Sequence, residues 1–511
     1  MGLVIIFGRL AELQVIKGEY FRSLAEGNRI RRVTIVAPRG RILDRNGVIL
    51  VDNQAVKKTV KFDPKEGYAK VSADEDTPEG EVITEWRRKY IYPTDTAHIT
   101  GYLGEAGGGE VGKVEPACPN KGVRLLGSFM GRGGMEQRYD CELRGIDGEE
   151  LVEVDTMGVR VRSLGRRPPF SGEDVTTNID YKLQKKVAAA MAGKPGAVIV
   201  STPNGKILAL YSSPSFDPNE DISKFLDDPS LPMFNRAIQG TYHPGSIFKI
   251  VTTAAAVEEQ KISRAYTYED LGVIAINEFQ YTNWYFTQYG GTEGVINVVR
   301  AIARSTDTFF YEVGALVGVD SLSKWARKFG LAEKTGIDLP GEAVGLVPSA
   351  EWKKATRGER WFLGNTYHMA IGQGDLAVTP VANHRLAGFV ANGGNICELK
   401  LVGEPSCINL GVGREAIELL LEGMKGACEP GGTGAPFFNF EPKVACKTGT
   451  AETSISDETH AWFSAFAPID PSTGEADDPQ YIITVLVEKG GEGSRVAAPI
   501  ARDIMDYIFN P

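Results

Sequence analysis

Two apolar runs joined by an Asn-Gly turn restrict most strongly what the C-terminal two thirds of this chain can fold into. The runs, Gly196–Ser201 and Lys206–Tyr211, flank Thr202-Pro-Asn-Gly205, and Asn-Gly between two such runs favours a tight β-hairpin. Three further strands are predicted near the C-terminus, at 444–450, 461–467 and 481–488. Helices are predicted at 181–191, from 246 through 257, and at 497–509. One antiparallel sheet built from both ends of this region and flanked by helices predicts an α+β fold.

The chain of 511 residues divides into three sections of different character. Residues 1–32 are helical in pattern and carry mixed charge. Residues 33–175 are rich in Gly, Pro and charge, with short strand-like runs, and predict an elongated, strand-rich domain. Residues 176–511 predict a compact domain. Within the middle section, loops are predicted at 107–109 and around 128–134, and a linker at 164–170, where two prolines interrupt regular structure.

Charge and metal-ligand content argue against two classes of function. The net charge is -10, which argues against a general nucleic-acid binder. Five scattered histidines and six cysteines without a CxxC spacing predict no metal site. The cysteines are interpreted as buried or free thiols. As an alternative, Cys397 and Cys407 close a short loop in an oxidising compartment.

The N-terminal segment leaves two interpretations open. Leu3–Phe7 is apolar, and a helical stretch follows over Arg9–Ala25. Five residues cannot cross a bilayer, which takes about 20, and no cleavable signal is visible. The segment is either the buried start of a helix or the outer end of a membrane anchor whose first part lies outside this sequence.

The sequence Ser246-Ile-Phe-Lys249 carries a candidate nucleophile and base. Residues three apart on a helix share a face, and a lysine whose pKa is lowered by burial can accept the proton of a nearby serine. Pro244-Gly245 places Ser246 at a helix start, where the amide groups favour developing negative charge. Ser321-Leu-Ser-Lys324 has the same spacing, but its charged surroundings predict a solvated helix.

The sequence Lys447-Thr-Gly-Thr450 carries a candidate substrate-binding strand. Lys447 supplies positive charge, and Thr448 and Thr450 can bind a carboxylate. The small Gly449 allows an extended substrate to lie against the strand edge. A second Lys-Thr-Gly, at 334–336, runs into a proline at 340 and is interpreted as structural.

Ser305-Thr-Asp307 is a third motif, which alone predicts only a helix cap or turn. It lies 59 residues after Ser246 and 142 residues before Lys447. Three motifs in this order match the serine acyltransferase set of penicillin-binding proteins and class A β-lactamases.

The chain as a whole resembles the class B penicillin-binding proteins, the monofunctional cell-wall transpeptidases. In the middle section, the resemblance rests on Ala37–Gly47, His98–Gly104, Gly134–Gln137 and Leu143–Gly145. In the C-terminal section, it rests on Ser213–Asn219, Ile371–Gly374 with Thr379-Pro380, and His460–Phe463. These segments are interpreted as structural. The resemblance implies a membrane-anchor end and juxtamembrane helix at 1–32, a pedestal domain of the dimerisation type at 33–175, and a penicillin-binding/transpeptidase domain at 176–511.

The resemblance also implies a division of labour among the motif residues. Ser246 is the nucleophile that becomes acylated, and Lys249 is its general base. Ser305 relays a proton to the leaving group, and Lys447 supports that relay electrostatically. Backbone amides of Ser246 and Thr450 form an oxyanion hole.

Substrates, partners and location follow from the same resemblance. The donor, a stem peptide ending in D-Ala-D-Ala, binds to Thr448, Gly449 and Thr450. An amine of a second stem peptide then attacks the acyl-enzyme. β-Lactams acylate Ser246 in place of the donor. No cofactor or metal is implied. A single transmembrane anchor, an extracytoplasmic catalytic domain in a bacterial cell membrane and a membrane glycosyltransferase of the SEDS type as partner are implied.

Asp307 departs from the family pattern, which usually has Asn at this position. An ionised carboxylate accepts hydrogen bonds but cannot donate them, and its charge would favour a protonated Lys249. Alternatively, Asp307 balances two nearby lysines and leaves catalysis intact. Two further functions therefore stay open beside the transpeptidase: a D,D-carboxypeptidase or β-lactamase with water as acceptor, and a non-catalytic wall-synthesis scaffold.

Overall fold

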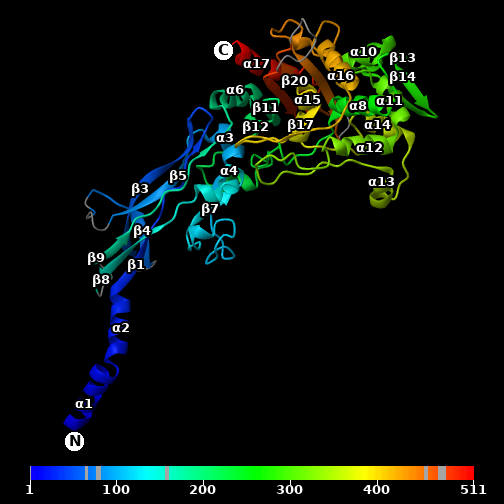
Figure 1. The fold of residues 1–511 in the computed structure, drawn as a ribbon. Coiled ribbons are helices and arrows are strands. Elements are labelled where there is room, and N and C mark those ends of the chain that lie inside the picture. The colour runs from blue at the N-terminus through cyan, green and yellow to red at the C-terminus, as the bar shows by residue number, and fades with distance from the viewer. Residues whose placement is uncertain are drawn as a thin grey trace.

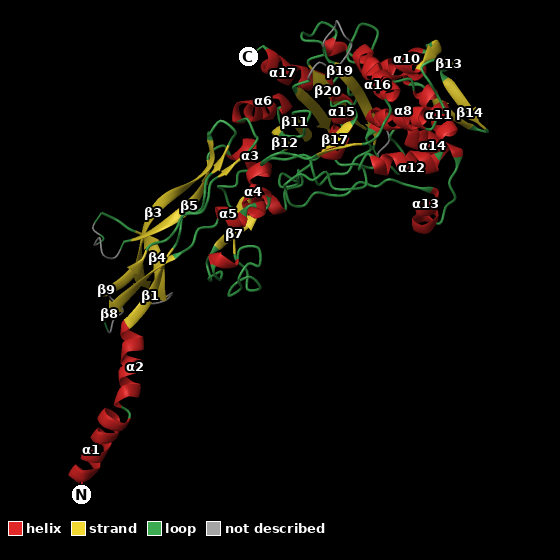
Figure 2. Ribbon diagram, in the orientation of Figure 1, coloured by secondary structure: helices red, strands yellow, loops and turns green. Residues whose placement is uncertain are grey.

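The computed structural model describes residues 2–63, 67–75, 77, 82–155, 160–453, 458–469 and 479–510. The chain runs from a pair of N-terminal helices through an elongated strand-rich domain to a large C-terminal domain at the opposite end of the molecule (Figure 1). Strands dominate the middle part, and helices surround a sheet in the C-terminal part (Figure 2). This arrangement confirms the predicted fold class.

The N-terminal section is helical, as predicted. It contains α1 (Gly2–Ala11), a π-helical turn (Glu12–Ile16) and α2 (Gly18–Arg29). The side chains of Leu3 to Phe7 are 59% to 76% exposed, so the interpretation of a buried helix start is wrong. Among the described residues, none of the helices is both long and apolar enough to cross a membrane.

The described residues of the middle section form three sheets. The first has the order β1-β8-β9, formed by Ile30–Ile35, Gly148–Val154 and Arg160–Arg167. The second has the order β10-β2-β3-β4 with β5 also paired to β3, formed by Val175–Thr176, Ile42–Leu43, Ile49–Asp63, Gly67–Ser72 and Ile83–Tyr90. The third pairs β6 (Tyr102–Glu105) with β7 (Phe129–Arg132). The short helices are α3 (Pro93–Thr100), α4 (Gly134–Arg138) and α5 (Asp140–Leu143).

Two local predictions in this section are wrong. Residues 128–134 are not a loop, because Phe129–Arg132 pairs with β6 and α4 begins at Gly134. The predicted linker is a strand up to Arg167. The two prolines that follow lack a backbone N–H and end that strand.

A buried ion-pair cluster joins distant segments of the strand-rich domain. Glu136, fully buried at the start of α4, lies 2.8 Å from Arg39 and 2.6 Å from Arg88. Arg39 also lies 2.9 Å from Asp140, which is paired in turn with Arg124. Two of the segments that carry the family resemblance, around residues 39 and 136, therefore meet in one electrostatic network.

The C-terminal domain is built on one antiparallel sheet with the order β12-β11-β21-β20-β19. Its strands are Ile207–Ser213, Gly196–Ser201, Tyr481–Val487, Thr459–Ala467 and Ala445–Glu452. The predicted hairpin is β11–β12, and the three predicted C-terminal strands fill the rest of the sheet. β19, which carries residues 447–450, lies at one edge.

Alternation along the strands gives this sheet two buried faces. Phe463 and Ala465 of β20 pack with α6 (Tyr181–Met191) and α17 (Ala497–Phe509). Trp462 and Phe466 point to the other face and pack into the larger helical layer. That layer contains α8 (Lys249–Glu258), α10 (Val298–Arg304), α11 (Asp307–Val317), α12 (Val319–Lys328), α14 (Leu363–Ala370), α15 (Pro380–Ala391) and α16 (Arg414–Ala427).

Smaller elements lie around this core. The remaining α-helices of the described residues are α7 (Ser223–Leu226), α9 (Trp284–Tyr289) and α13 (Ala350–Arg357). The remaining strands form three two-stranded sheets: β13 (Thr267–Asp270) with β16 (Gly294–Asn297), β14 (Val273–Ile276) with β15 (Phe279–Thr282), and β17 (Asn395–Cys397) with β18 (Cys407–Asn409).

The interpretation of the cysteines as thiols is wrong, because all six form disulfides. Cys397–Cys407 closes the predicted short loop. Cys118–Cys141 and Cys428–Cys446 join residues 23 and 18 positions apart, and no cysteine in the described ranges is free. The last two pairings depend on how α5 and β19 pack, which sequence spacing does not reveal.

Candidate active site

Ser246 lies in a tight turn where α8 begins. Gly245–Phe248 is a 3₁₀ turn, and the α-helix starts at Lys249, three residues later than predicted. Gly245 has φ 57° and donates its N–H to the carbonyl of Gly372 at 3.0 Å. A Cβ on Gly372 would lie 2.1 Å from the carbonyl oxygen of Gly245, so the turn requires glycine there. The turn holds Ser246 half-buried at the helix N-terminus.

Lys249 is almost fully buried, and all three of its donors point to the Ser305–Asp307 segment. Its Nζ donates to the carbonyl of Ser305 at 2.9 Å, to the Oγ of Ser305 at 3.1 Å and to the Oδ1 of Asp307 at 2.7 Å. Burial lowers the pKa of Lys249, although the Asp307 charge opposes that shift. The structure therefore shows Lys249 in an ion pair with Asp307. Burial makes the ammonium group of Lys249 easier to deprotonate.

Ser305 sits at the junction of two helices. It has φ 55° and ends α10, and Thr306 precedes the first residue of α11, Asp307. This left-handed residue turns the chain so that the Ser305 Oγ accepts from the Nζ of Lys249 and, at 2.9 Å, from the Nζ of Lys447. The motif is the turn that the sequence predicts, and it also brings a hydroxyl between two lysines.

Lys447 is fully buried on β19. Besides Ser305, its Nζ donates to the carbonyl of Thr448 at 3.1 Å. Burial and then the charge of Lys249 lower the pKa of Lys447 well below its ordinary value. One carboxylate, Asp307, faces two buried lysines, so the geometry favours a single positive charge shared across Ser305.

Thr448 is oriented by a residue that the sequence analysis missed. Its hydroxyl donates to the Oγ1 of Thr433 at 2.8 Å. Thr433 lies in the loop after α16, and the Cys428–Cys446 disulfide fastens the start of that loop to β19 directly before Lys447. The signal in the sequence was a lone threonine within Gly431-Gly-Thr-Gly434, which carries no chemistry by itself.

Gln373 is the second residue that was missed, because its segment was interpreted as structural. Its Nε2 donates to the carbonyl of Thr450, and its Oε1 accepts from the N–H of Glu452, both at 3.2 Å. Thr450 and Glu452 are two apart, so their backbone groups point to the same side of the edge strand β19. The Gln373 amide therefore caps the free edge of β19 just beyond Thr450.

Gly449 and Thr450 have neighbours that fit a binding strand. A Cβ on Gly449 would lie 2.9 Å from the Cβ of Trp462, so a larger residue is excluded. The Oγ1 of Thr450, which is exposed, accepts from the N–H of Gly493 at 3.4 Å.

The two duplicate motifs lie outside this cluster. Lys324 is exposed on α12, whose Leu322 and Ser323 face the core. In the second Lys-Thr-Gly, the buried Thr335 donates to Glu342, and the carbonyl of Gly336 accepts from Lys400. Both copies are structural, as predicted, although α12 is amphipathic rather than solvated throughout.

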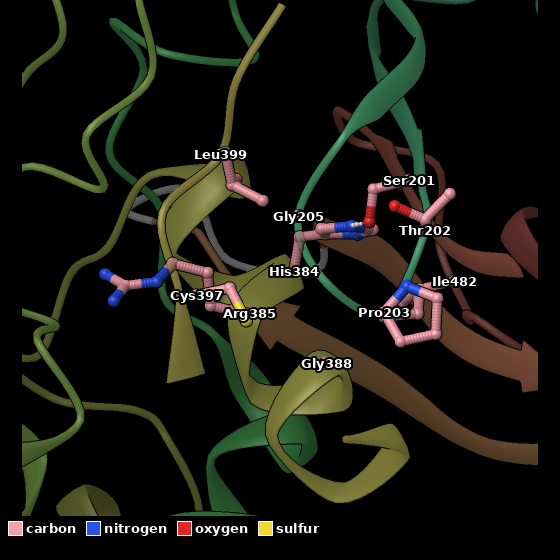
Figure 3. A pocket seen from close by; sticks show the side chains of 10 residues that line it. All are labelled: Ser201, Thr202, Pro203, Gly205, His384, Arg385, Gly388, Cys397, Leu399 and Ile482. Carbon is pink, nitrogen blue, oxygen red and sulfur yellow. Dashed lines mark hydrogen bonds between the residues drawn. The ribbon is translucent and has the colours of Figure 1, made fainter. Parts of the chain in front are cut away.

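A small cavity of about 10 Å³ near His384 is structural as well (Figure 3). The ring of His384 bonds to the hydroxyls of Ser201 at 2.7 Å and Thr484 at 2.9 Å. Burial lowers the pKa of His384 to about 3, so the ring is neutral and crosslinks α15 to the sheet. Across the described ranges, no three His, Cys, Asp or Glu side chains gather as a metal site.

Two family models match the chain. The penicillin binding protein transpeptidase domain matches residues 196–506. The penicillin-binding protein dimerisation domain matches residues 58–177. Together the two matches extend from the strand-rich domain to the last helix.

Individual relatives resemble nearly the whole chain. A peptidoglycan D,D-transpeptidase MrdA of Escherichia coli is 30% identical, over 99% of this chain and 92% of that protein. A crystal structure of Pseudomonas aeruginosa PBP2 in complex with WCK 5153 is 29% identical, with a TM-score of 0.74, over 93% of this chain and 96% of that one. A structure of the complex between PBP2 and MreC from Helicobacter pylori is similar with a TM-score of 0.80 at 24% identity. The likeness covers 94% of this chain and 99% of that one.

Proposed function

Because this chain belongs to the class B penicillin-binding proteins, which are serine-type peptidoglycan D,D-transpeptidases, we propose that it cross-links stem peptides through an acyl-enzyme on Ser246. The observation that carries this assignment is the hydroxyl of Ser305 held between Lys249 and Lys447 at 3.1 and 2.9 Å, beside the helix start that bears Ser246. Such a cluster supplies a base and a proton path within one buried site.

In the acylation step, the Oγ of Ser246 attacks the carbonyl carbon of the penultimate D-alanine. Lys249, in its deprotonated form, takes the proton from that Oγ; burial lowers the pKa of Lys249 and so favours this form. In this proposal the backbone N–H groups of Ser246 and Thr450 stabilise the oxyanion.

In the departure of the leaving group, the bond to the terminal D-alanine breaks and its nitrogen needs a proton. Lys249 now carries the proton from Ser246, and Ser305 accepts a hydrogen bond from it. Ser305 passes a proton to the leaving nitrogen and is reprotonated from Lys249. Lys447, on the other side of the same hydroxyl, stabilises the negative charge that develops on Ser305 during the transfer.

The donor peptide binds by strand addition to the free edge of β19. Its terminal carboxylate lies near the hydroxyls of Thr448 and Thr450 and the charge at Lys447. Gly449 lets β19 pack closely against Trp462, because a Cβ there would lie 2.9 Å from the Cβ of Trp462. An amine of a second stem peptide then attacks the acyl-enzyme by the reverse sequence of proton transfers.

The enzyme acts at the outer face of a bacterial membrane, where this substrate is found. Exposed apolar side chains on α1, from Leu3 to Phe7, support contact with the lipid phase. A SEDS-type glycosyltransferase is the proposed partner. A solved structure of a peptidoglycan synthase complex, similar to this chain with a TM-score of 0.75 at 29% identity, supports an assembly of this kind.

The test is a cross-linking reaction on uncross-linked glycan strands, digested to muropeptides and analysed by mass spectrometry. We expect dimeric muropeptides that disappear after addition of benzylpenicillin. Release of D-alanine without dimers would identify a carboxypeptidase instead. Neither dimers nor release from folded protein would leave the scaffold as the better account.

A further inference from the structure

Three tyrosine rings pack together where α11, α14 and β15 meet. The helices α11 and α14 contact each other and lie side by side in Figure 1. Tyr311 of α11 stacks on Tyr367 of α14, with ring centroids 5.2 Å apart. Tyr281 of β15 meets both rings edge-on, at 5.8 Å from Tyr311 and 5.1 Å from Tyr367. These residues form the tyrosine cluster, and the chemistry described above uses none of them.

The helix α11 places the tyrosine cluster beside the ion pair of the candidate active site. Tyr311 follows Asp307 by four residues, so the two side chains lie on one face of α11. The carboxylate of Asp307 lies 2.7 Å from the ammonium of Lys249. Burial, then the charge of Asp307 and then that of Glu452, raise the pKa of the Tyr311 phenol. Two carboxylates, one on α11 and one on β19, therefore act on the hydroxyl of Tyr311.

The tyrosine cluster has hydrogen-bonding groups that the protein does not use. Tyr311 is 7% exposed and Tyr367 is 4% exposed, yet the hydroxyls of all three tyrosines make no hydrogen bond to any described residue. None of these oxygens is sealed from solvent without a partner, so each can be reached from outside. Rings that are buried while their hydroxyls stay open are suited to hold a polar ligand.

Glu452 adds an unpaired carboxylate. It lies two residues after Thr450, so its side chain is on the same face of β19, and its N–H donates to the Oε1 of Gln373 at 3.2 Å. No basic side chain of the described residues forms an ion pair with Glu452. Burial lowers the pKa of His368, against the charge of Glu452, so this ring is neutral near pH 7. Its centroid lies 5.7 Å from that of Tyr281.

The basic side chains on α13 are occupied elsewhere. Lys353 lies 3.3 Å from Glu359, and Arg357 lies 2.5 Å from Asp375. The negative charge of Glu452 is therefore left for a ligand. A carboxylate attracts a cation by charge, phenol oxygens accept hydrogen bonds from N–H groups, and aromatic rings favour a nearby cation. The combination suits an ammonium group.

We propose that Tyr281, Tyr311 and Glu452 bind the attacking amine of the second stem peptide, which arrives as an ammonium. Glu452 pairs with the ammonium, and the two phenol oxygens accept its other N–H groups. One proton passes to solvent, and the neutral amine then attacks the acyl carbon. As the amide bond forms and the ester bond breaks, a second proton of the amine ends on the Oγ of Ser246. This inference rests on the proposed function, because it requires the acyl-enzyme.

The test follows how one acyl-enzyme divides between two products. A thioester donor that contains no amine acylates the protein. The acceptor is an N-acetylated tripeptide stem that ends in lysine or in diaminopimelic acid; the better acceptor of the two is used throughout. Transfer to the amine and hydrolysis are measured while the acceptor concentration is raised. Both products come from the same acyl-enzyme, so their ratio does not depend on the rate of acylation.

Two variants and a control localise the effect. Glu452→Gln should raise the acceptor concentration at which transfer equals hydrolysis by about tenfold, as for one charge-assisted hydrogen bond. Tyr311→Phe should raise it about fivefold, as for one neutral hydrogen bond. Glu441→Gln, which removes an exposed carboxylate before β19, should leave it unchanged. An unchanged concentration in folded Glu452→Gln would overturn the assignment.

A second measurement on the unaltered chain needs no variant. Dimethylation of the acceptor amine keeps its charge but prevents a stable amide, whereas acetylation removes the charge. We expect the dimethylated tripeptide to inhibit transfer at a concentration at least about tenfold lower than the acetylated one. Equal inhibition by the two would overturn the inference.

Failure of the inference can be told apart from failure of the proposed function. If neither the thioester nor benzylpenicillin acylates the folded, unaltered chain, or if acylation is followed by hydrolysis alone, the proposed function fails and the inference fails with it. If transfer occurs and Glu452→Gln needs no more acceptor than the unaltered chain, the inference alone fails.

Discussion

The ammonium of Lys249 lies 2.7 Å from the carboxylate of Asp307, and the two groups form an ion pair at the centre of the site. The side chain of Lys249 is 1% exposed and that of Asp307 is 16% exposed. Burial and the charge of Lys249 lower the pKa of Lys447, and the same carboxylate opposes that shift. Asp307 therefore favours the protonated form of both lysines against the effect of burial, and the two alternatives stated for it from the sequence describe one electrostatic system.

Replacing this carboxylate should change the pH dependence of acylation. In Asp307→Asn, the group that opposes deprotonation of Lys249 is gone, so the pKa of Lys249 falls further. Because the base acts when it is neutral, we expect the acid limb of the acylation profile to move to lower pH. The measurement is the acylation rate with benzylpenicillin against pH. A limb that stays in place or moves to higher pH would contradict the role of Asp307.

Thr433 should act through Thr448 rather than on the reacting atoms. In Thr433→Val, the hydroxyl that orients Thr448 at 2.8 Å is lost, and we expect β-lactam acylation to slow about tenfold through weaker initial binding. Thr433→Ser keeps the hydroxyl and should restore most of the rate. Stopped-flow kinetics separate the binding constant from the maximal acylation rate. A loss confined to the maximal rate would argue against positioning of the substrate carboxylate.

The Cys428–Cys446 disulfide should contribute measurably to stability. It closes a segment of 18 residues, which corresponds to about 3 kcal/mol of unfolding free energy. We expect the double variant Cys428→Ala with Cys446→Ala to unfold at a lower denaturant concentration than the unaltered chain. Added reductant should lower the midpoints of both chains, because Cys118–Cys141 and Cys397–Cys407 remain in the variant, and should remove the difference between the two chains. Equal midpoints for the two chains without reductant would show that the bond does not stabilise the domain.

The buried carboxylate of Glu136 should be essential to the strand-rich domain. Glu136→Gln leaves Arg39 and Arg88 without their shared anion, and breaking a buried ion pair in this way costs about 3 to 5 kcal/mol. The matched control is Glu142→Gln, an exposed carboxylate on α5, for which we expect less than about 0.5 kcal/mol. Chemical unfolding of both variants measures the difference. Similar stabilities would contradict the importance of the cluster.

Periodicity predicted the framework of the C-terminal domain well, because its sheet is buried on both faces. The apolar runs of β11, β20 and β21 are long enough only for strands buried in the core. The helices α6 and α17 begin and end at the residues where the helical pattern of apolar positions begins and ends. The strand-rich domain was harder. Residues 161–167 of β9 are exposed and rich in arginine, so the pairing of this strand depends on its neighbours rather than on a hydrophobic pattern.

The residues of the site could be predicted where a short motif contains the reactive groups. They could not be predicted where the role of a residue depends on a tertiary contact. Ser246, Lys249, Ser305 and Lys447 were all identified from spacing and order. Their roles remain proposals, but the structure brings Lys249, Ser305 and Lys447 into one hydrogen-bonded cluster. Thr433 and Gln373 were missed, because each acts through a distant partner. Thr433 contacts Thr448, 15 residues later in the sequence, and Gln373 contacts Thr450, 77 residues later.

Covalent labelling with a fluorescent penicillin tests the central claim most directly. The unaltered chain and Ser246→Ala are incubated with the reagent, denatured and separated by electrophoresis, with circular dichroism to show that both are folded. The account predicts a stable labelled band for the unaltered chain, no band for Ser246→Ala, and a peptide modified at Ser246 on digestion. A band that persists in Ser246→Ala, or no band from the folded, unaltered chain, would contradict it.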